Sequence, residues 1–484
     1  MLFNSFEFLI FFPVVTFLYF LLPHRFRWLH LLLASCVFYM AFIPVYILIL
    51  LGTIVIDYVA GILIENAQGA QRKRYLLMSL VANIGVLAVF KYYNFFIDNI
   101  NVVFHSVSSH YTLSYLGIIL PLGLSFHTFQ AMSYTIEVYR GNYPAERHFG
   151  IYALYVMFYP QLVAGPIERP QNILHQFREK HRFSYELATS GLRLMAWGLF
   201  KKVVIADRLA VLVNQVYDNP HQHQGLPLVL ATLFFAIQIY CDFSGYSDMA
   251  LGSARVMGFR LMTNFNRPYL ARTIADFWKR WHISLSSWFR DYLYISVGGN
   301  RVSIPRRYFN LFLVFLVSGF WHGANWTFII WGALHGTYQI VGLLTRSFRQ
   351  RLTSFLPTWF DHGLDVALTG ALVTFAWIFF RAHSFSDAWY VITHMLAPSH
   401  AVAEGVDRYG RLSVYLTYSR QEWLFMVAGV GTLLAFELAQ HRYDIEALLV
   451  RQSAGLRWTT YFALVIAIAG CGAFEKVQFI YFQF

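Results

Sequence analysis

Residues 318–326 read Ser318-Gly319-Phe320-Trp321-His322-Gly323-Ala324-Asn325-Trp326, and they join two apolar runs at 308–321 and 326–345. A basic cluster at 301–307 precedes the first run and indicates the cytoplasmic surface, because Lys and Arg collect on that side of a membrane. At ~1.5 Å per helical residue the first run extends roughly 20 Å into a hydrocarbon core of about 30 Å. His322 is therefore predicted to lie deep in the membrane.

An ionisable side chain at that depth favours a functional role, because burying it in a bilayer is costly. A neutral histidine with an ordinary pKa of about 6.5 can take a proton from an attacking hydroxyl. The alternative is a core histidine satisfied by hydrogen bonds between helices. Asn325 could orient an imidazole or polarise a carbonyl, or it could cap the helix that follows. His335 is a further candidate, which we interpret as mostly structural.

Composition places the chain among multi-pass membrane proteins. Of its 484 residues, 57% are hydrophobic and 13% are charged, and the mean hydropathy is +0.48; soluble domains have about 25% charged residues. The net charge of +12 is spread over short loops, which is typical of anchoring against anionic lipid and makes nucleic acid an unlikely partner. Three separated cysteines indicate neither disulfides nor a thiolate metal site. No removable signal peptide is expected.

Apolar segments predict ten to twelve membrane crossings in an all-α, polytopic integral membrane fold, with re-entrant or interfacial helices around a central cavity. They fall at 5–23, 29–43, 45–64, 75–98, 115–139, 203–217, 226–250, 308–321, 326–345, 366–382, 422–440 and 458–478. The loops 99–112 and 218–225 contain no Lys or Arg and are predicted to lie outside the cytoplasm. The long polar stretch 383–421 is also predicted outside, as a loop where a partner could dock.

Loops with and without basic residues should alternate along a chain that crosses the membrane repeatedly, and two segments break this pattern. Segments 149–165 and 273–295 each have basic residues on both sides, so we expect re-entrant or interfacial elements that enter from the cytoplasm. Irregular backbone at membrane depth is tolerated only inside protein or along a cavity. The region 149–345 is therefore predicted to enclose a cavity and to form the catalytic core of a single membrane domain covering 1–484.

Residues 276–292 have helical periodicity. Trp278, Trp281, Leu285, Trp288 and Tyr292 would share one face. Lys279, Ser286 and Arg290 would share the other, with His282 at the boundary. One interpretation is a basic amphipathic helix in the headgroup layer. The other is a wall of the cavity whose cations bind an anionic substrate that donates a chemical group.

Other charged residues stand in unexpected places. Asp242 and Asp248 interrupt an apolar run, where they could pair with Arg or His across the bundle or form a proton path; we favour pairing. Glu168-Arg169 lies beside Gly165-Pro166 and could be a gate or an inert surface pair.

Several catalytic patterns are absent from the sequence. It contains no G-x-S-x-G elbow, H-E-x-x-H motif, P-loop or G-x-G-x-x-G fingerprint, which argues against a covalent hydrolase, a zinc protease and an ATP-driven pump. The chemistry that the sequence still supports is catalysis by one base within the membrane, reached through a cytoplasmic opening lined with cations.

The chain resembles the membrane-bound O-acyltransferase (MBOAT) family, in the bacterial branch typified by the alginate O-acetylation membrane protein. The stretches that carry the resemblance span nearly the whole chain: 160–167, 238–248, 265–269 continuing through 279–286, 318–326, and the C-terminal 479–484.

The resemblance implies that His322 is the family's catalytic histidine and His282 its second characteristic polar position. It also implies an acyl-thioester donor that enters from the cytoplasm. In the bacterial branch the acyl group typically passes across the membrane to a partner, such as a periplasmic SGNH-type acetyltransferase, that places it on an exported polymer.

We therefore expect an inner-membrane O-acetyltransferase that uses acetyl-CoA as substrate, with no permanently bound cofactor and no metal. The donor phosphates would dock on Lys279, Arg280 and Arg290, with Ser286 nearby. His322 would act as general base, and His282 or Asn325 would steady the developing oxyanion.

Two alternatives stay open. The first is transfer of D-alanyl from a carrier-protein thioester toward teichoic acid. The second, from a different class, is a proton-coupled transporter or flippase that uses His322, Asp242 and Asp248 as a relay; inverted repeats would favour it, and none is visible in the sequence. The acceptor polymer, which could be alginate, peptidoglycan, cellulose or another glycan, is not determined by the sequence.

Overall fold

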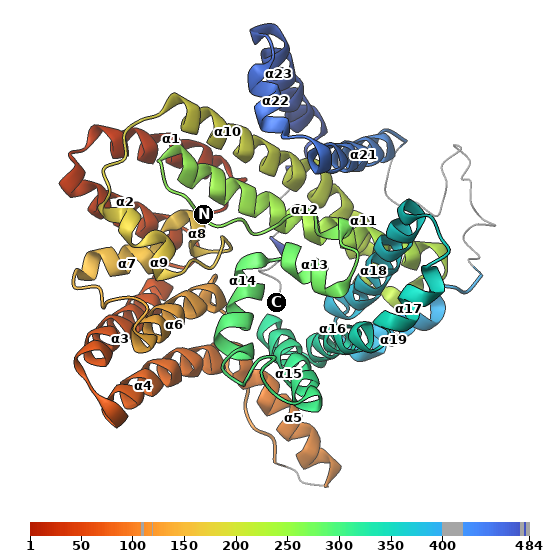
Figure 1. The fold of residues 1–484 in the computed structure, drawn as a ribbon, viewed down its shortest axis with the longest axis horizontal. Coiled ribbons are helices and arrows are strands. Elements are labelled where there is room, and N and C mark those ends of the chain that lie inside the picture. The colour runs from red at the N-terminus through yellow and green to blue at the C-terminus, as the bar shows by residue number, and fades with distance from the viewer. Residues whose placement is uncertain (108–110, 119, 399–419, 475–478, 481–484) are drawn as a thin grey trace. The chain divides into compact units, whose positions relative to one another are not determined.

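Helices form the regular structure of the chain, as the sequence predicted. The computed structural model describes all residues except 108–110, 119, 399–419, 475–478 and 481–484 (Figure 1). Within this described part there is no strand. The chain packs as two compact units, unit 1 with residues 1–194 and 249–263, and unit 2 with residues 195–248 and 264–484.

Unit 1 consists mainly of the N-terminal helices. They are α1 (Phe6–Leu21), α2 (His24–Met40), α3 (Ile47–Asn66), α4 (Gly69–Leu87), α5 (Tyr93–Ser106), α6 (Leu124–Arg140), α7 (Phe149–Met157), α8 (Tyr159–Leu162) and α9 (Pro170–Ile173). Two boundaries between the units fall within α10 (Tyr185–Leu199) and α12 (Leu226–Val256), and the third falls between residues 263 and 264.

Unit 2 contains the remaining helices, including those that carry the predicted site. They are α11 (Asp207–Tyr217), α13 (Ile274–Arg280), α14 (Ile283–Trp288), α15 (Ile304–His322), α16 (Trp326–Leu344), α17 (Arg346–Thr353), α18 (Thr358–Arg381), α19 (Phe385–His394), α21 (Arg420–Arg442), α22 (Ile445–Arg451) and α23 (Ala454–Cys471). Three π-helical segments, η2 (Ala88–Tyr92), η4 (Phe200–Ala206) and η7 (Phe289–Tyr294), interrupt the α-helices.

Seven helices of the described part are long and apolar enough to cross a membrane, so the protein is a multi-pass membrane protein. They are Pro44–Asn66, Gly69–Ser106, Leu226–Val256, Trp326–Leu344, Thr358–Arg381, Gln421–Arg442 and Ala454–Cys471. The sequence predicted ten to twelve crossings. Two of the additional segments form α1 and α2, which have only 16 and 17 residues, and segment 203–217 forms the end of η4 and then α11.

The predicted crossing at 115–139 is wrong in its first part, because α6 begins only at Leu124. The described residues from 111 to 122 are non-helical. Two asparagines of α5 hold this segment: Asn101 pairs with the N–H and C=O of Leu113 at 2.8 and 3.1 Å, and Asn94 pairs in the same way with Leu116 at 2.8 and 2.9 Å. The two amides satisfy backbone groups that a helix would otherwise have paired.

The predicted continuous helix over 276–292 is also wrong, because the chain breaks between α13 and α14. His282 has a left-handed backbone with φ +44°. The freed backbone groups pair with a neighbouring loop: Asn266 N donates to Arg280 O, and Ile283 N donates to Asn264 O, both at 2.9 Å. Helical periodicity in the sequence does not reveal a partner loop that takes over these hydrogen bonds.

The two other irregular regions differ in outcome. Segment 149–165 forms the short helices α7 and α8, and its residues 150–165 are buried; its place relative to a membrane stays a prediction. The stretch 383–421, predicted as a loop, contains the helix α19, which is a correction. Its residues 399–419 lie outside the described part.

Helices α15 and α16 pack in backbone contact through glycines. A Cβ atom on Gly319 would lie 2.3 Å from the carbonyl oxygen of Phe328, and one on Gly332 would lie 2.3 Å from that of Phe315. Small residues allow such close approach between membrane helices. The contact fixes how the end of α15, with His322, lies against α16.

We predict that Gly332→Ala destabilises the protein by about 1–3 kcal/mol, because the added methyl group meets backbone that cannot move without separating the helices. Gly342→Ala, on the same helix with nothing within 4 Å of its Cβ position, is the matched control and is expected to be neutral or slightly stabilising. Thermal unfolding in detergent measures both. Equal midpoints for the two variants would contradict the close packing.

Candidate active site

His322 is the last residue of α15, and its side chain is buried among aromatic rings of unit 2. The imidazole centroid lies 4.9 Å from the ring of Trp321, 5.0 Å from Trp331 and 5.4 Å from Phe380. The helix ends here because Gly323 is extended, with φ −160°. The side chain of His322 is buried within the protein, at 5% exposure; its predicted depth in the membrane stays a prediction.

Asn325 caps α16, as one of the two interpretations of the sequence had it. Its Oδ1 accepts a hydrogen bond from Thr327 N at 3.0 Å, and its Nδ2 donates to the carbonyl of His383 at 2.9 Å. Both ends of the amide therefore bind backbone groups. The predicted catalytic role of Asn325 finds no support in these contacts.

His282 lies in the turn between α13 and α14, and Asn264 holds it there. The Oδ1 atom of Asn264 lies 3.1 Å from His282 Nδ1, and it accepts hydrogen bonds from the Ser284 hydroxyl at 2.9 Å and from Ser284 N at 3.3 Å. Because this atom accepts from a backbone N–H, it is the amide oxygen and has no proton to donate. In its contact with His282, the ring atom Nδ1 must therefore be the donor. One buried amide thus fixes the turn, which non-glycine residues adopt only at a cost.

This contact also sets the chemistry of the His282 ring. Burial lowers the pKa of His282 to about 3, so the ring is neutral. Because its proton is on Nδ1, its Nε2 is a hydrogen-bond acceptor. An acceptor nitrogen cannot donate to an oxyanion, so the predicted oxyanion role of His282 is not favoured by the geometry.

A continuous row of aromatic rings connects the two histidines. Consecutive centroid distances are 4.7 Å for His282–Phe243, 4.9 Å for Phe243–Phe265, 5.1 Å for Phe265–Trp281, 5.2 Å for Trp281–Trp377, 5.8 Å for Trp377–Trp331 and 5.0 Å for Trp331–His322. This row, which we name the aromatic wall, offers an apolar surface between two imidazoles.

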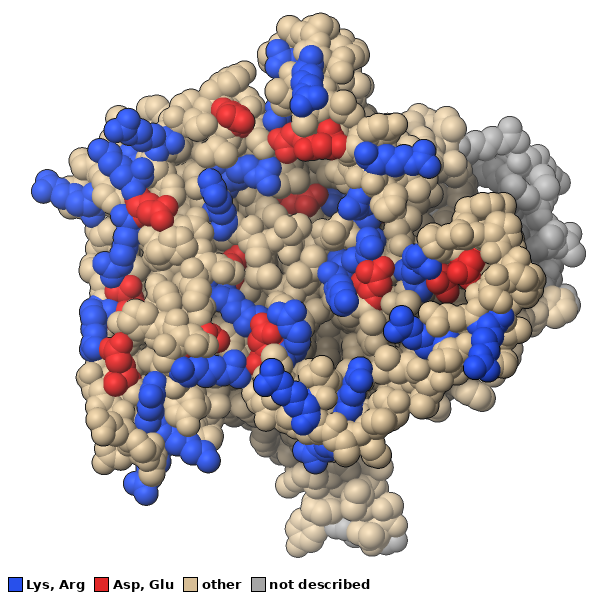
Figure 2. Space-filling view, in the orientation of Figure 1, with Lys and Arg blue, Asp and Glu red and all other residues tan. Residues whose placement is uncertain are grey.

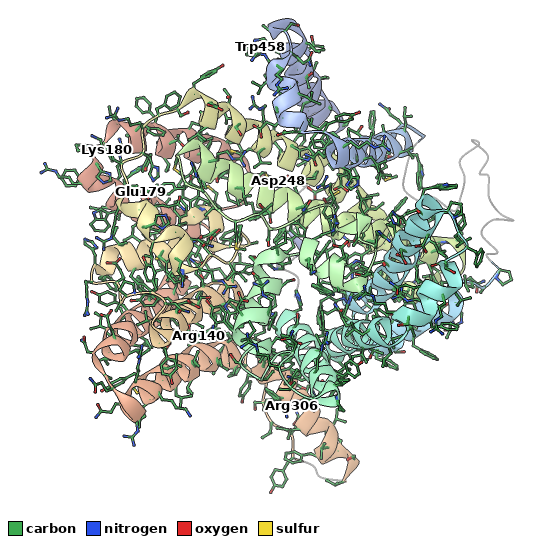
Figure 3. All side chains as sticks on the ribbon, in the orientation of Figure 1. Arg140, Glu179, Lys180, Asp248, Arg306 and Trp458 are labelled. Carbon is green, nitrogen blue, oxygen red and sulfur yellow. The ribbon has the colours of Figure 1, made fainter. Side chains whose placement is uncertain are left out.

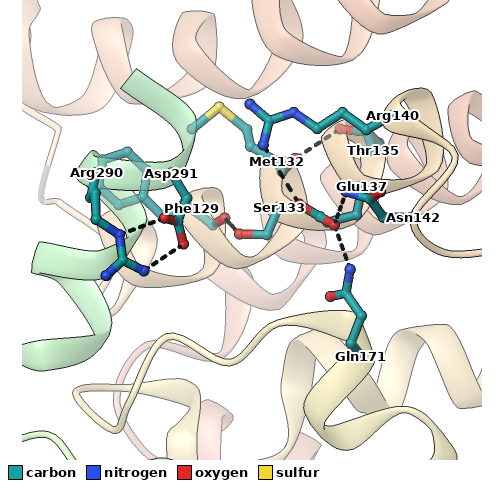
Figure 4. A network of polar contacts seen from close by, with 10 residues as sticks. All are labelled: Phe129, Met132, Ser133, Thr135, Glu137, Arg140, Asn142, Gln171, Arg290 and Asp291. Atoms are coloured by element: carbon teal, nitrogen blue, oxygen red, sulfur yellow. Dashed lines mark hydrogen bonds and ion pairs between the residues drawn. The ribbon is translucent and has the colours of Figure 1, made fainter. Parts of the chain in front are cut away.

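The predicted donor-binding cations differ in how they are paired. Lys279 is exposed. Arg280 contacts Asp276 at 2.9 Å, and Arg290 forms a two-pronged contact with Asp291 at 2.7 and 3.2 Å (Figure 4). The Ser286 hydroxyl donates to the carbonyl of Trp281 at 3.1 Å. Figure 2 likewise shows many Lys and Arg side chains with an acidic neighbour beside them.

Sequence reasoning missed a largely buried ion-pair network that joins η4, α11 and α12. Lys202 contacts Asp242 at 2.7 Å and Asp207 at 2.6 Å. Lys201 contacts Asp248 at 2.8 Å (Figure 3 labels Asp248 on α12) and donates to the Ser244 hydroxyl at 2.8 Å. The predicted pairing of the two aspartates is confirmed, but with lysines and not with Arg or His. The sequence feature that could have indicated this network is the pair of adjacent lysines, Lys201 and Lys202, within an apolar run.

Glu168 of the Glu168-Arg169 pair does not lie on the surface, because its side chain is fully buried in unit 1, whereas Arg169 is partly exposed. Its carboxyl group accepts hydrogen bonds from Asn172 at 3.2 Å and from the backbone N–H of Met262 at 2.5 Å. Burial raises the pKa of Glu168 to about 7. A second buried carboxylate of unit 1, Glu137, accepts from Asn142 at 3.0 Å and from Gln171 (Figure 4). Glu168 thus joins α9 to the segment after α12, and Glu137 joins α6 to α9, all within unit 1.

No three His, Cys, Asp or Glu side chains of the described residues gather in a way that could hold a metal ion. The groups of unit 2 described above that could take part in a reaction are imidazoles, indole N–H groups and lysine–aspartate pairs.

Comparison with known proteins decides the family. The profile of the membrane-bound O-acyltransferase (MBOAT) family matches residues 147–384. A protein of Pseudomonas aeruginosa named "Probable alginate O-acetylase AlgI" is 41% identical over 401 residues, which cover 82% of this chain and 75% of the relative. The chain belongs to the membrane-bound O-acyltransferase family. It is therefore a multi-pass membrane acyltransferase.

Two other relatives extend the comparison within the family. The peptidoglycan O-acetyltransferase of Helicobacter pylori is 35% identical, and the alignment covers 100% of this chain and 98% of the relative. The teichoic acid D-alanyltransferase of Bacillus subtilis is 24% identical over 277 residues, covering 55% of this chain and 68% of the relative. The matched range contains His282, His322 and Asn325, together with all three aspartates of the ion-pair network.

We predict that Lys202→Met destabilises the protein by about 3–5 kcal/mol, because it leaves two buried carboxylates without their cation. Replacing all three members (Lys202→Met with Asp207→Asn and Asp242→Asn) should recover much of that loss. Lys73→Met, at an exposed position, is the control. If the single variant unfolds at the wild-type temperature in detergent, Lys202 does not hold the network together.

We predict that Asn264→Ala lowers stability by about 1–3 kcal/mol, because buried donors of Ser284 and His282 lose their acceptor. Acyl-transfer activity should fall with it, since the left-handed turn at His282 is no longer held. Asn266→Ala, two residues away, removes a side chain that is exposed and contacts Arg267. Equal thermal midpoints and activities for the two alanine variants would contradict the positioning role of Asn264.

Proposed function

We propose that the protein is an inner-membrane O-acetyltransferase, which moves an acetyl group from cytoplasmic acetyl-CoA toward hydroxyl groups of an exported polysaccharide. The observation that carries the proposal is the buried imidazole of His322 at the end of α15, against Trp331 and Phe380. The names of the relatives support O-acetylation of a polysaccharide, since one is a probable alginate O-acetylase and another a peptidoglycan O-acetyltransferase.

His322 acts as general base in this proposal. The imidazole takes the proton of the acceptor hydroxyl while the hydroxyl oxygen forms a bond to the thioester carbonyl carbon. When the C–S bond breaks, the coenzyme A thiolate leaves and receives that proton from the imidazolium. Atoms and charges balance without a metal or a redox step. The aromatic rings around the buried His322 side chain limit the access of water and therefore hydrolysis of the thioester.

Lys279 is the cation we assign first to the donor phosphates. It is exposed at the end of α13, whereas Arg280 and Arg290 already contact Asp276 and Asp291. A guanidinium next to a carboxylate attracts a phosphate less strongly, because its charge is partly balanced. Arg280, Arg290 and Ser286 are therefore secondary candidates for donor contacts.

The proposal also includes a periplasmic partner. In the family branch that the sequence resembles, an SGNH-type acetyltransferase receives the acetyl group and places it on the polymer. The stretch 383–421 is the predicted docking surface; of that stretch, the structure describes residues 383–398, which include α19, and residues 420–421 at the start of α21.

A second candidate is transfer of D-alanyl from a carrier-protein thioester toward teichoic acid. It is favoured by the resemblance to the teichoic acid D-alanyltransferase of Bacillus subtilis, at lower identity and coverage than the O-acetylation relatives. The base chemistry at His322 would be the same, and the two candidates differ in the donor.

We predict that His322→Ala abolishes transfer of radiolabel from acetyl-CoA by purified protein in detergent supplied with cell-envelope extract. Loss of a general base lowers the rate by about 10²–10⁴-fold. His441→Ala, at an exposed position of α21, is the control and should keep wild-type activity. Unfolding temperatures of both variants are measured to show that the fold is intact.

Wild-type transfer retained in His322→Ala would contradict the assignment of the base. No turnover of acetyl-CoA by the wild type would point to a carrier-protein thioester as the donor. If that donor is inert as well, the acyltransfer proposal fails and the transport alternative returns.

A further inference from the structure

One face of α16 carries three polar side chains that point into protein. Thr327, Trp331 and His335 are spaced four residues apart and therefore lie above one another on the helix. Each is fully buried. Within the described residues, Thr327 Oγ1, Trp331 Nε1 and His335 Nε2 have no hydrogen-bond partner. Buried polar groups are nearly always paired, so a row of such atoms on one face indicates a binding role.

The tautomer of His335 is fixed by a neighbour on α13. Trp278 Nε1 donates a hydrogen bond to His335 Nδ1 at 3.2 Å, so that Nδ1 is an acceptor and the ring is neutral. The proton of a neutral imidazole then lies on Nε2. His335 thus presents an N–H donor, which is the opposite arrangement to His282, where Nδ1 carries the proton.

Trp331 presents a second donor, since the indole nitrogen has a proton and no lone pair to accept with. Its ring lies 5.0 Å from that of His335 and 5.0 Å from that of His322. Trp331 is therefore in ring contact with the base of the proposed reaction and with the second donor. Both need a hydrogen-bond acceptor as partner, and the acceptor that an acyl-transfer reaction brings beside its base is the carbonyl oxygen of the thioester.

We propose that Trp331 Nε1 and His335 Nε2 donate hydrogen bonds to the carbonyl oxygen of the acyl thioester. Trp278 is a positioning residue that holds the proton of His335 on Nε2. As the acceptor oxygen bonds to the carbonyl carbon, the C=O electron pair moves onto this oxygen, and the two N–H groups stabilise the resulting charge. The pair returns when the C–S bond breaks and the thiolate takes the proton held by His322.

This inference rests on the proposed function and assigns it a further pair of catalytic residues. The donors would act most strongly on the oxyanion and only weakly on the neutral carbonyl. The expected signature is therefore a loss of kcat with KM nearly unchanged. Binding of an amide-containing thioester arm by the same N–H groups would raise KM, and binding of water alone would leave both constants unchanged.

The test is steady-state turnover of acetyl-CoA by the full-length protein in detergent, with KM and kcat measured separately. His335→Phe and Trp331→Phe keep an aromatic ring and remove the N–H group. We expect each to lower kcat by about 10²–10³-fold. His335→Gln, which retains an N–H donor, should recover part of the loss. Tyr338→Phe, on the same helix beside His335, is the control and should retain the wild-type kcat.

Each result decides the proposal. A rise in KM with unchanged kcat, or unchanged constants in both donor variants, would overturn it. If His335→Phe does not fold, Trp278→Phe replaces it, and a lower kcat at constant KM is again expected. Absence of acetyl-CoA turnover in the wild type would contradict the proposed donor instead; the same variants are then compared on a carrier-protein thioester, where the same loss of kcat is expected.

Discussion

The close contact between α15 and α16 is the constraint on which the site depends. Gly319 and Gly332 let the two backbones touch, since a single methyl group on either would lie 2.3 Å from a carbonyl oxygen of the other helix. At that separation the end of α15 brings His322 against Trp331, at 5.0 Å between ring centroids. Glycines that add no chemistry of their own thus determine where the base lies relative to the polar face of α16.

Two buried histidines show how neighbours give one side-chain type different roles. Asn264 accepts from His282 and leaves that ring with an acceptor nitrogen, while Trp278 donates to His335 and leaves that ring with a donor. The difference comes from the group that each Nδ1 atom meets, an amide oxygen at His282 and an indole N–H at His335. These contacts set the positions of the two ring protons.

Much of the fold and part of the site could be predicted from the sequence. The all-α membrane fold, the burial of His322 and the capping by Asn325 follow from hydropathy and from local helix signals, which act over a few residues. The break at His282 could not, because it depends on hydrogen bonds that Asn264, 18 residues away, accepts. The pairing of Asp242 with Lys202 joins positions 40 residues apart, and the extended residues after α5 depend on Asn94 and Asn101. Local patterns contain no information on these partners.

The π-helical segment η4 has a consequence for the ion-pair network. Its i→i+5 hydrogen bonds place one more residue in a turn than an α-helix does, and within it the adjacent Lys201 and Lys202 are both buried and both reach aspartates of α12. In a regular α-helix, consecutive side chains diverge by about 100° and do not share a face. The ion-pair network therefore depends on the number of residues in this turn as well as on their charges. Inserting or deleting one residue in η4 would turn one of the two lysines away from its aspartate, although both lysines would still be present.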